Sequence, residues 1–302
     1  MNTATAPRPP SKDERRAAFR RASWPERVAM HQAIAAAKAE AMEARRELGR
    51  RYLQRHAGAL EVPFERAVAV ANLAAETAAA RAEGVALAKD RAAELNNGAL
   101  EFPALAHDFA ADSATIALAA SPLIMAPVTR YCGMLPVLFN LFVTRAHTTE
   151  LITTSAHLFH LDPEDVISFK VFIHLTEVDD DCGPFHALPA DRSAEVIDKV
   201  GYVGIERITD EEMDRLVGWA AVVKVTGPPG TVAFADTTRC LHFGGRPRAP
   251  GKPVRDMIVF QYLLPTSLLF PVDGDAKHPR FLPHLEPTGD PEWDALIGAR
   301  WT

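Results

Sequence analysis

Two histidines and one carboxylate are the residues of this chain with the clearest chemical potential. His160, Leu161 and Asp162 form an H-x-D triplet, and on an extended segment the first and third side chains of such a triplet point to the same face. An imidazole and a carboxylate would then share one small volume, as two of the three ligands of a 2-His-1-carboxylate metal site. H-x-D triplets are common by chance, so this interpretation requires a second histidine elsewhere in the chain.

The candidate second histidine is His242, which follows an apolar strand-like segment and precedes a glycine-rich turn. Arg255 comes shortly afterwards, at the head of another apolar strand-like segment, and its planar guanidinium suits a carboxylate partner. Each residue also has an ordinary alternative. His242 could be a core or turn histidine, and Arg255 could be a surface charge paired with Asp256.

Composition restricts the class of protein. The 302 residues are 48% hydrophobic and 24% charged, as in a soluble globular protein of one large domain or slightly more. Three scattered cysteines without a C-x-x-C pair argue against a disulfide framework and fit a cytoplasmic location. No uninterrupted apolar run is long enough to cross a membrane, and a net charge of -6 gives no reason to expect nucleic-acid binding.

The N-terminal third reads as helical. We expect a disordered tail over 1–12 and then a helix from a capping box at Ser23 and Glu26 to about His56. A second alanine-rich helix over about 64–95 would complete a helical hairpin, so that 1–98 form an N-terminal helical region. Alanine buries little apolar surface, so these helices need a partner, either the rest of the chain or another subunit in a homo-oligomer. The first 60 residues are also basic, with 13 Lys and Arg against 6 Asp and Glu.

The rest of the chain changes to short apolar strands punctuated by Gly and Pro, after two further helices over about 112–120 and 122–131. This order predicts an α+β protein whose 99–302 domain ends in a sandwich or barrel. The expected strands cover 137–145, 167–175, 222–225, 231–235 and 254–263.

The conjunction of H-x-D, a distant His and a following Arg resembles the iron(II)/2-oxoglutarate dioxygenases. The flanking segments Leu158–Asp165 and Phe169–Phe185 look like the phytanoyl-CoA dioxygenase family, in which a K-V-F strand continues into an acidic D-V-D turn ending in G-P. The resemblance covers about 120–265. It implies a double-stranded β-helix, or jelly-roll, core that carries the helical N-terminal region.

The resemblance also assigns roles. His160, Asp162 and His242 would bind iron(II), and Arg255 would bind the distal carboxylate of 2-oxoglutarate. O2 would be the second co-substrate, and succinate and CO2 would be released. Because Asp162 retains the carboxylate that related halogenases replace, we expect hydroxylation of a small molecule whose identity the sequence does not give.

Residues around the site are expected to support it. Lys170 and His174 share one face of the 167–175 strand with Phe172, and that face should line the cavity, with Lys170 and His174 contacting 2-oxoglutarate. Arg145 and His147 are further candidates for contact with the co-substrate or substrate, and Asp236 and Arg239 are candidates for orienting the loop that holds His242.

Two departures from the family pattern concern the co-substrate contacts and not the metal ligands. The family's P-G-S-H sequence reads Pro189-Ala-Asp-Arg-Ser193 here, and Gly244 stands where many members carry Ser. Two alternatives also stay open: a non-catalytic jelly-roll binding or scaffold protein, and a cupin-like metal enzyme that does not use 2-oxoglutarate.

Overall fold

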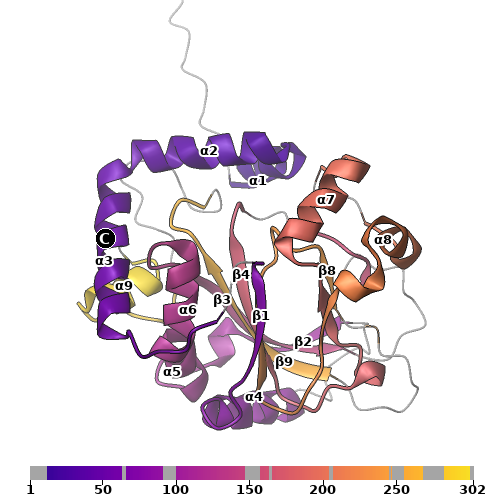
Figure 1. The fold of residues 1–302 in the computed structure, drawn as a ribbon. Coiled ribbons are helices and arrows are strands. Elements are labelled where there is room, and N and C mark those ends of the chain that lie inside the picture. The colour runs from indigo at the N-terminus through magenta and orange to yellow at the C-terminus, as the bar shows by residue number, and fades with distance from the viewer. Residues whose placement is uncertain are drawn as a thin grey trace, which may run out of the picture.

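Two antiparallel sheets form the centre of the computed structural model (Figure 1). The large sheet has the strand order β1-β7-β4-β9-β3-β2, and the small sheet has the order β6-β5-β8. The structure describes residues 12–62, 66–90, 100–146, 157–162, 165–203, 207–244, 246, 255–267 and 282–299. The strands are β1 (Val68–Asn72), β2 (Leu100–Leu105), β3 (Val137–Ala146), β4 (Ser168–His174), β5 (Phe185–Ala187), β6 (Val223–Val225), β7 (Thr231–Asp236), β8 (His242–Phe243) and β9 (Arg255–Leu263).

Helices cover the outer faces of both sheets. In Figure 1, α3, α5, α6 and α9 stand on one side of the large sheet, α7 and α8 lie beside the small sheet, and α2 runs across the top. Among the described residues, no helix is both long and apolar enough to span a membrane. The helices are α1 (Lys12–Arg21), α2 (Trp24–Ala37), α3 (Ala39–Arg55), α4 (Ala78–Asp90), α5 (Ala114–Ala120), α6 (Pro122–Cys132), α7 (Ala190–Val200), α8 (Asp210–Val217) and α9 (Pro291–Leu296).

The large sheet is buried on both faces because its strands alternate two sets of apolar side chains. One set, which includes Phe169, Val171 and Ile258, packs against the helices in the main core. The other set, which includes Phe172 and Met257, packs against the small sheet in a second core. The chain passes repeatedly between the two sheets, because β4, β7 and β9 belong to the large one and β5, β6 and β8 to the small one. The expected mixture of helices and antiparallel sheets is therefore confirmed.

The strands that the sequence predicted are present, but the helical hairpin is wrong. Residues 68–72, expected within a helix over about 64–95, form β1, which pairs with β7 at the edge of the large sheet. Among the described residues of this region, the helix is α4. Val68 and Val70 alternate with alanines, and this short β-compatible pattern gains its stability from pairing with a strand far along the chain. Part of the predicted N-terminal helical region 1–98 therefore belongs to the large sheet. The domain boundary near 98 stays a prediction, and the predicted tail lies almost wholly outside the described residues.

The predicted helix from Ser23 to His56 is divided at Lys38 into α2 and α3, which run in different directions (Figure 1). The capping box is present, because the Glu26 carboxylate accepts hydrogen bonds from the Ser23 backbone N–H and hydroxyl. The buried Arg45 of α3 donates to the carbonyls of Leu135, Pro136 and Ala295. For α3, the partner is therefore the rest of the same chain.

Candidate metal centre

Backbone pairing brings the two candidate histidines together. The N–H of His160 donates to the carbonyl of His242, and the N–H of His242 donates to the carbonyl of His160, each at 3.0 Å. The N–H of Asp162 donates to the carbonyl of Thr237 at 2.9 Å. On the opposite face of this ladder, Phe159 and Phe243 pack edge to face with ring centroids 4.7 Å apart. These apolar rings anchor the outer face, so the histidines face inward.

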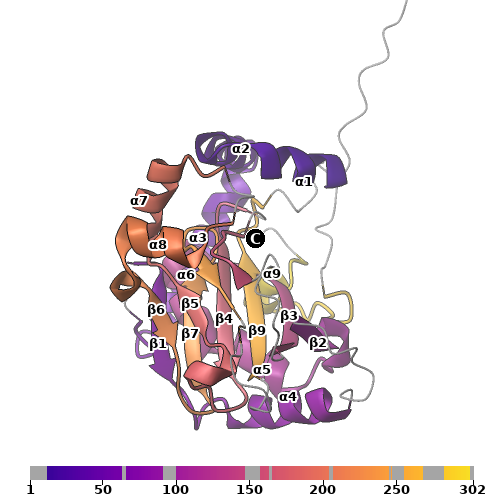
Figure 2. The same ribbon diagram turned by 90° about the vertical axis from the view of Figure 1, so that its right-hand side faces the viewer.

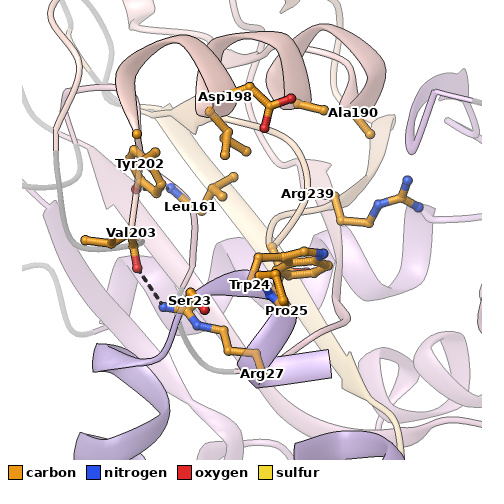
Figure 3. Close-up of a pocket in the computed structure, with 14 residues that line it drawn as sticks. Ser23, Trp24, Pro25, Arg27, Leu161, Ala190, Asp198, Tyr202, Val203 and Arg239 are labelled. Carbon is orange, nitrogen blue, oxygen red and sulfur yellow. Dashed lines mark hydrogen bonds between the residues drawn. The ribbon is translucent and has the colours of Figure 1, made fainter. Parts of the chain in front are cut away.

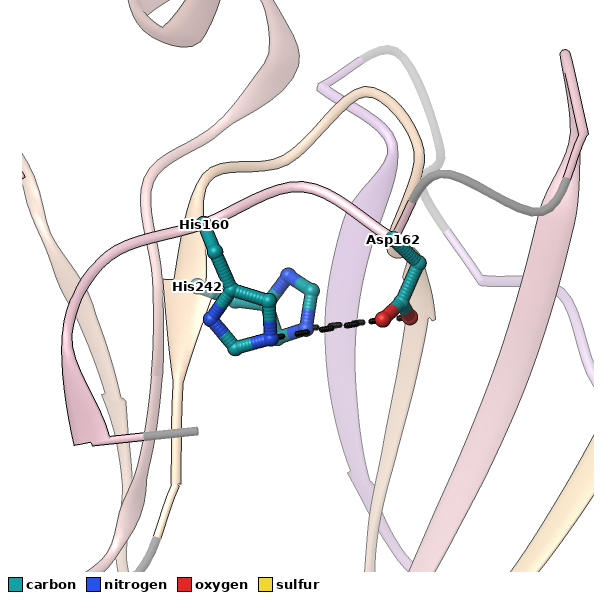
Figure 4. Close-up of side chains that lie close together, drawn as sticks. All are labelled: His160, Asp162 and His242. Atoms are coloured by element: carbon teal, nitrogen blue, oxygen red, sulfur yellow. Dashed lines mark ion pairs between the residues drawn. The ribbon is translucent and has the colours of Figure 1, made fainter. Parts of the chain in front are cut away.

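The three side chains converge on one point, as the sequence predicted (Figure 4). One donor atom from each of His160, Asp162 and His242 lies within 4.8 Å of the other two. The Nε2 atom of His160 is 4.0 Å from Oδ1 of Asp162, and Nε2 of His242 is 3.8 Å from Oδ2. Two imidazoles and one carboxylate on one face are the donor set that suits a non-haem iron(II) site with open positions.

Hydrogen bonds fix the tautomer of both imidazoles. The Nδ1 atom of His160 is 2.8 Å from the carbonyl of Leu158, and Nδ1 of His242 is 2.9 Å from the carbonyl of Cys240. A carbonyl only accepts, so each Nδ1 carries the proton and each Nε2 presents its lone pair. Metal-binding histidines commonly donate their other N–H in this way. The residues present therefore fit a metal ion.

Burial keeps the two histidines neutral. It lowers the pKa of His242 to about 3, with the neighbouring His160 adding to the effect, and it lowers the pKa of His160 as well. Burial acts in the opposite sense on Asp162, but the charge of Lys170 and the neighbouring imidazoles outweigh it and hold the pKa of Asp162 below its usual value. At neutral pH all three groups are in the protonation state that binds a cation.

Lys170 and His174 lie on the expected face of β4. Phe172, between them, packs in the core between the two sheets, whereas Val171 and Ile173 pack against the helices. The ammonium of Lys170 lies 2.6 Å from Oδ2 of Asp162. Lys170 is therefore next to one of the metal-ligand candidates. The contacts of Lys170 and His174 with 2-oxoglutarate stay predictions.

Polar side chains with unused hydrogen-bonding capacity gather farther along the same face. His174 and Thr144 both pair with Met257 from either side of β9, and Arg255 lies two residues before Met257. With the described residues, hydrogen bonds are missing from Nε and Nη1 of Arg255 and from the hydroxyl of Thr144, and the His174 ring lies near the backbone of Gly227. Burial lowers the pKa of Arg255 to about 10, so the guanidinium is still charged at neutral pH.

Gly244 lies beside this charge. A Cβ atom there would be 3.4 Å from Nη2 of Arg255, so the backbone at position 244, where many relatives of the expected family carry serine, packs close to the guanidinium. A buried cation with unused donors is a site for a carboxylate. This set of residues fits the distal end of a dicarboxylate.

The expected contact of Arg145 with the co-substrate or substrate is not what the structure shows. Arg145 was expected near the co-substrate but forms a two-pronged ion pair with Asp256, at 2.8 and 2.7 Å, on the helix-facing side of the sheet. That prediction was wrong, because alternation along β3 turns Thr144 inward and Arg145 outward. The same count of alternation could have found Thr144 from the sequence. His147 lies outside the described residues.

The loop before His242 is organised by Asp236. Its carboxylate accepts hydrogen bonds from the backbone N–H and hydroxyl of Thr238 and from the hydroxyl of Tyr131. Arg239 reaches the same network by donating to the Tyr131 hydroxyl at 3.3 Å. These contacts fit the predicted role of Asp236 and Arg239 in orienting the loop.

Sequence reasoning missed Tyr202, which holds the backbone between the two ligands of the H-x-D triplet. Its hydroxyl accepts a hydrogen bond from the N–H of Leu161 at 3.0 Å. Tyr202 and Leu161 also line a cavity of about 550 Å³ between α2 and α7, with Trp24 on its far side (Figure 3). Leu161 stands between His160 and Asp162 in the chain, but none of the three metal-ligand candidates lines this cavity.

Comparisons with known proteins gave only distant structural likenesses. No protein-family model and no curated protein sequence matches the chain. Among solved structures, HygX from Streptomyces hygroscopicus, with nickel and 2-oxoglutarate bound, is 13% identical with a TM-score of 0.47, over 67% of this chain and 84% of that one. EctD from S. alaskensis with bound iron is 19% identical with a TM-score of 0.47, over 76% and 82%. At these scores the likenesses carry no functional weight, and function must be inferred from the site itself.

Proposed function

We propose that this chain is an iron(II)- and 2-oxoglutarate-dependent oxygenase that hydroxylates a small molecule. The observation that carries the proposal is the pairing of two features on one inner face. The first is the facing triad of His160, Asp162 and His242. The second is the buried guanidinium of Arg255, whose Nε and Nη1 lack hydrogen-bond partners among the described residues and whose Nη2 lies beside Gly244.

The proposal includes the finer assignments. The two facing sheets would form a double-stranded β-helix of the phytanoyl-CoA dioxygenase type, consistent with a chain that alternates between them. The balanced reaction takes substrate, 2-oxoglutarate and O2 to hydroxylated substrate, succinate and CO2. Iron(II), when bound, supplies the activation of O2 and the oxidation of both organic molecules.

The chain's own residues provide position and charge for this reaction. His160, Asp162 and His242 would hold the metal on one face and leave its other positions free for 2-oxoglutarate and O2. Arg255, with Thr144 and His174 beside it, would bind the distal carboxylate and set the direction in which the co-substrate lies. His242 and Arg255 are buried, which would keep bulk water away from this part of the site.

The direct test is anaerobic reconstitution of the full chain with iron(II) and 2-oxoglutarate. We expect a visible absorption band that requires both components, followed by succinate release when air and a panel of small molecules are added. Asp162→Ala and His242→Ala should abolish the band and the succinate. Asp198→Ala, which removes an exposed carboxylate on α7, is the matched control and should retain both.

The same experiment separates the two alternatives. A scaffold protein would show neither the band nor tight iron binding. A metal enzyme that does not use 2-oxoglutarate would bind iron, but its metal site would not respond to 2-oxoglutarate, and Arg255→Ala would change nothing in this titration. Turnover like that of the wild type in Asp162→Ala would contradict the proposed role of the triad.

A further inference from the structure

We propose that a cavity beside the metal centre binds the substrate, and that this substrate is a small neutral molecule with an apolar ring face and an amide-like polar edge. The inference rests on the proposed function and extends it to substrate class. The cavity has a volume of about 370 Å³ and lies over β2, β3, β4 and β9, which neighbour one another in the large sheet (Figure 2). Lys170 lines the cavity and also contacts Asp162 at 2.6 Å. The cavity is therefore one side chain away from the metal ligands.

Two β-bulges shape the wall of this cavity. The pairing of β2 with β3 shifts register between Glu101 and Ala104, and the pairing of β3 with β9 shifts between Leu138 and Asn140. Phe102 lies in the first irregularity and Phe139 in the second, and both rings line the cavity. Bulges redirect side chains and are frequent beside active sites. The two irregularities therefore bring aromatic rings to the same cavity.

Apolar side chains in the wall of this cavity are exposed to solvent. Phe102 is 48% exposed and Leu105 is 42% exposed, although both are large apolar side chains. Phe102 packs edge to face on Phe142 with ring centroids 5.5 Å apart, so the aromatic surface is fixed in place. A flat apolar ligand would remove this surface from water and stack on it.

The polar side chains of the cavity come from one row of residues across three paired strands. Asn140 of β3 pairs with Gln261 of β9, which pairs with Lys170 of β4. The Gln261 amide donates to the Ser168 hydroxyl at 2.9 Å, which leaves its oxygen to accept from a ligand. The Asn140 amide makes no hydrogen bond with the described residues, so it offers a donor and an acceptor. This row is complementary to a lactam, an amide or a similar donor–acceptor edge.

The charges around the cavity favour a neutral ligand. Among the described residues that line it, there is no carboxylate to bind a cation. Its cationic group, Lys170, is already paired with Asp162, so an anion would have to compete with that pair. A neutral ligand needs no carboxylate partner and does not compete with the ion pair of Lys170 and Asp162.

The test uses four bicyclic probes of similar size on the full chain loaded with zinc(II) and 2-oxoglutarate, by ligand-observed NMR. The probes are quinolin-2-one, naphthalene, 2-naphthoate and 2-naphthylmethylammonium, which share a fused bicyclic shape and differ in polar group and charge. We expect quinolin-2-one to bind at least about tenfold more tightly than either charged probe. A single neutral hydrogen bond contributes about 1 kcal/mol, or roughly fivefold in affinity. Asn140→Leu should therefore weaken quinolin-2-one about fivefold and leave naphthalene unchanged.

Two further variants complete the design. Phe102→Ala, at an exposed position that does not carry the fold, should weaken both uncharged probes. Asn72→Leu on β1, outside the cavity, should weaken none. Tighter binding of a charged probe, or equal loss of quinolin-2-one and naphthalene in Asn140→Leu, would overturn the inference.

Failure of the oxygenase assignment gives a different result. If iron(II) and 2-oxoglutarate do not bind but the unloaded chain still prefers quinolin-2-one, the cavity assignment stands and the proposed reaction falls. If iron(II) and 2-oxoglutarate bind but the probes do not discriminate, the reaction stands and the substrate class is wrong.

Discussion

The Lys170 ammonium lies 2.6 Å from the Oδ2 atom of Asp162, so a fixed cation shares the carboxylate that faces His160 and His242. Both side chains are largely buried. A metal ion bound by the triad would therefore meet a positive charge already present at its carboxylate ligand. The pair keeps Asp162 ionised when no metal is bound, but it also repels an incoming dication.

Replacing this cation should have opposite effects on the metal and on 2-oxoglutarate. Coulomb's law gives several kcal/mol between a unit charge and a dication about 5 Å apart at an effective dielectric constant of about 20. Loss of a ligand's hydrogen-bond partner costs about ten- to a hundredfold in metal affinity, or roughly 1.4 to 2.8 kcal/mol. Repulsion is the stronger of the two effects, so Lys170→Met should tighten cobalt(II) binding at least about tenfold and weaken the subsequent binding of the 2-oxoglutarate dianion. Calorimetric titrations in sequence measure both.

The matched control for this prediction is Lys224→Met. Lys224 forms an ion pair with Asp180 at 2.6 Å near the surface, so its removal should change neither affinity. Weaker cobalt(II) binding in Lys170→Met would mean that orientation of the carboxylate outweighs repulsion.

Arg255 should lower the stability of the ligand-free protein and should be necessary for the binding of 2-oxoglutarate. The side chain is 2% exposed, and Nε and Nη1 lack partners among the described residues. Removing a buried charge without full compensation often stabilises a protein. Arg255→Met should therefore raise the melting temperature of the ligand-free protein and reduce 2-oxoglutarate affinity at least about tenfold, with cobalt(II) affinity retained. A lower melting temperature together with unchanged 2-oxoglutarate binding would assign Arg255 a purely structural role.

The predicted convergence of His160, Asp162 and His242 is observed, whereas their binding of iron stays a prediction. The H-x-D half of the triad follows from local geometry, and His242 follows from the resemblance to the dioxygenase pattern. Alternation makes His160 and Asp162 share a face, and the strand-like segment before His242 places it beside a sheet. The inward face of β4 followed from the same period of two, which set Phe172 against the small sheet and Ile173 against the helices.

What the sequence did not predict depends on contacts between distant segments. β1 looks helical in an alanine-rich context, and only its pairing with β7 makes it a strand. Tyr202 has no motif of its own, because its role comes from the hydrogen bond of its hydroxyl with the N–H of Leu161. The bulges at Phe102 and Phe139 are likewise visible only once the strands are paired.

His174 should make the protein sensitive to acid. Burial, with the nearby charge of Arg255, lowers the pKa of His174 to about 4, compared with about 6.5 in the unfolded chain. As pH falls below about 6.5, the unfolded state binds a proton that the folded state does not, so stability decreases with falling pH until about 4. Between pH 7 and 5 this one group accounts for about 2 kcal/mol. Over this pH interval, the free energy of unfolding of His174→Gln, measured by urea denaturation, should fall by about 2 kcal/mol less than that of the wild type. His107→Gln, at an exposed position, should behave like the wild type.

Tyr202 should position the metal ligands through the backbone. Tyr202→Phe removes the acceptor for the Leu161 N–H and leaves a buried donor unsatisfied, at a cost of about 1 to 3 kcal/mol. Tyr262→Phe is the matched control, because it removes a hydroxyl that donates to the Ala119 carbonyl at 2.8 Å in the helix-facing core. Both variants should unfold at lower urea concentration. Only Tyr202→Phe should also weaken cobalt(II) binding and alter the visible spectrum of the bound ion, because Leu161 joins His160 to Asp162. Equal cobalt(II) affinity and identical spectra in the two variants would show that Tyr202 serves the fold alone.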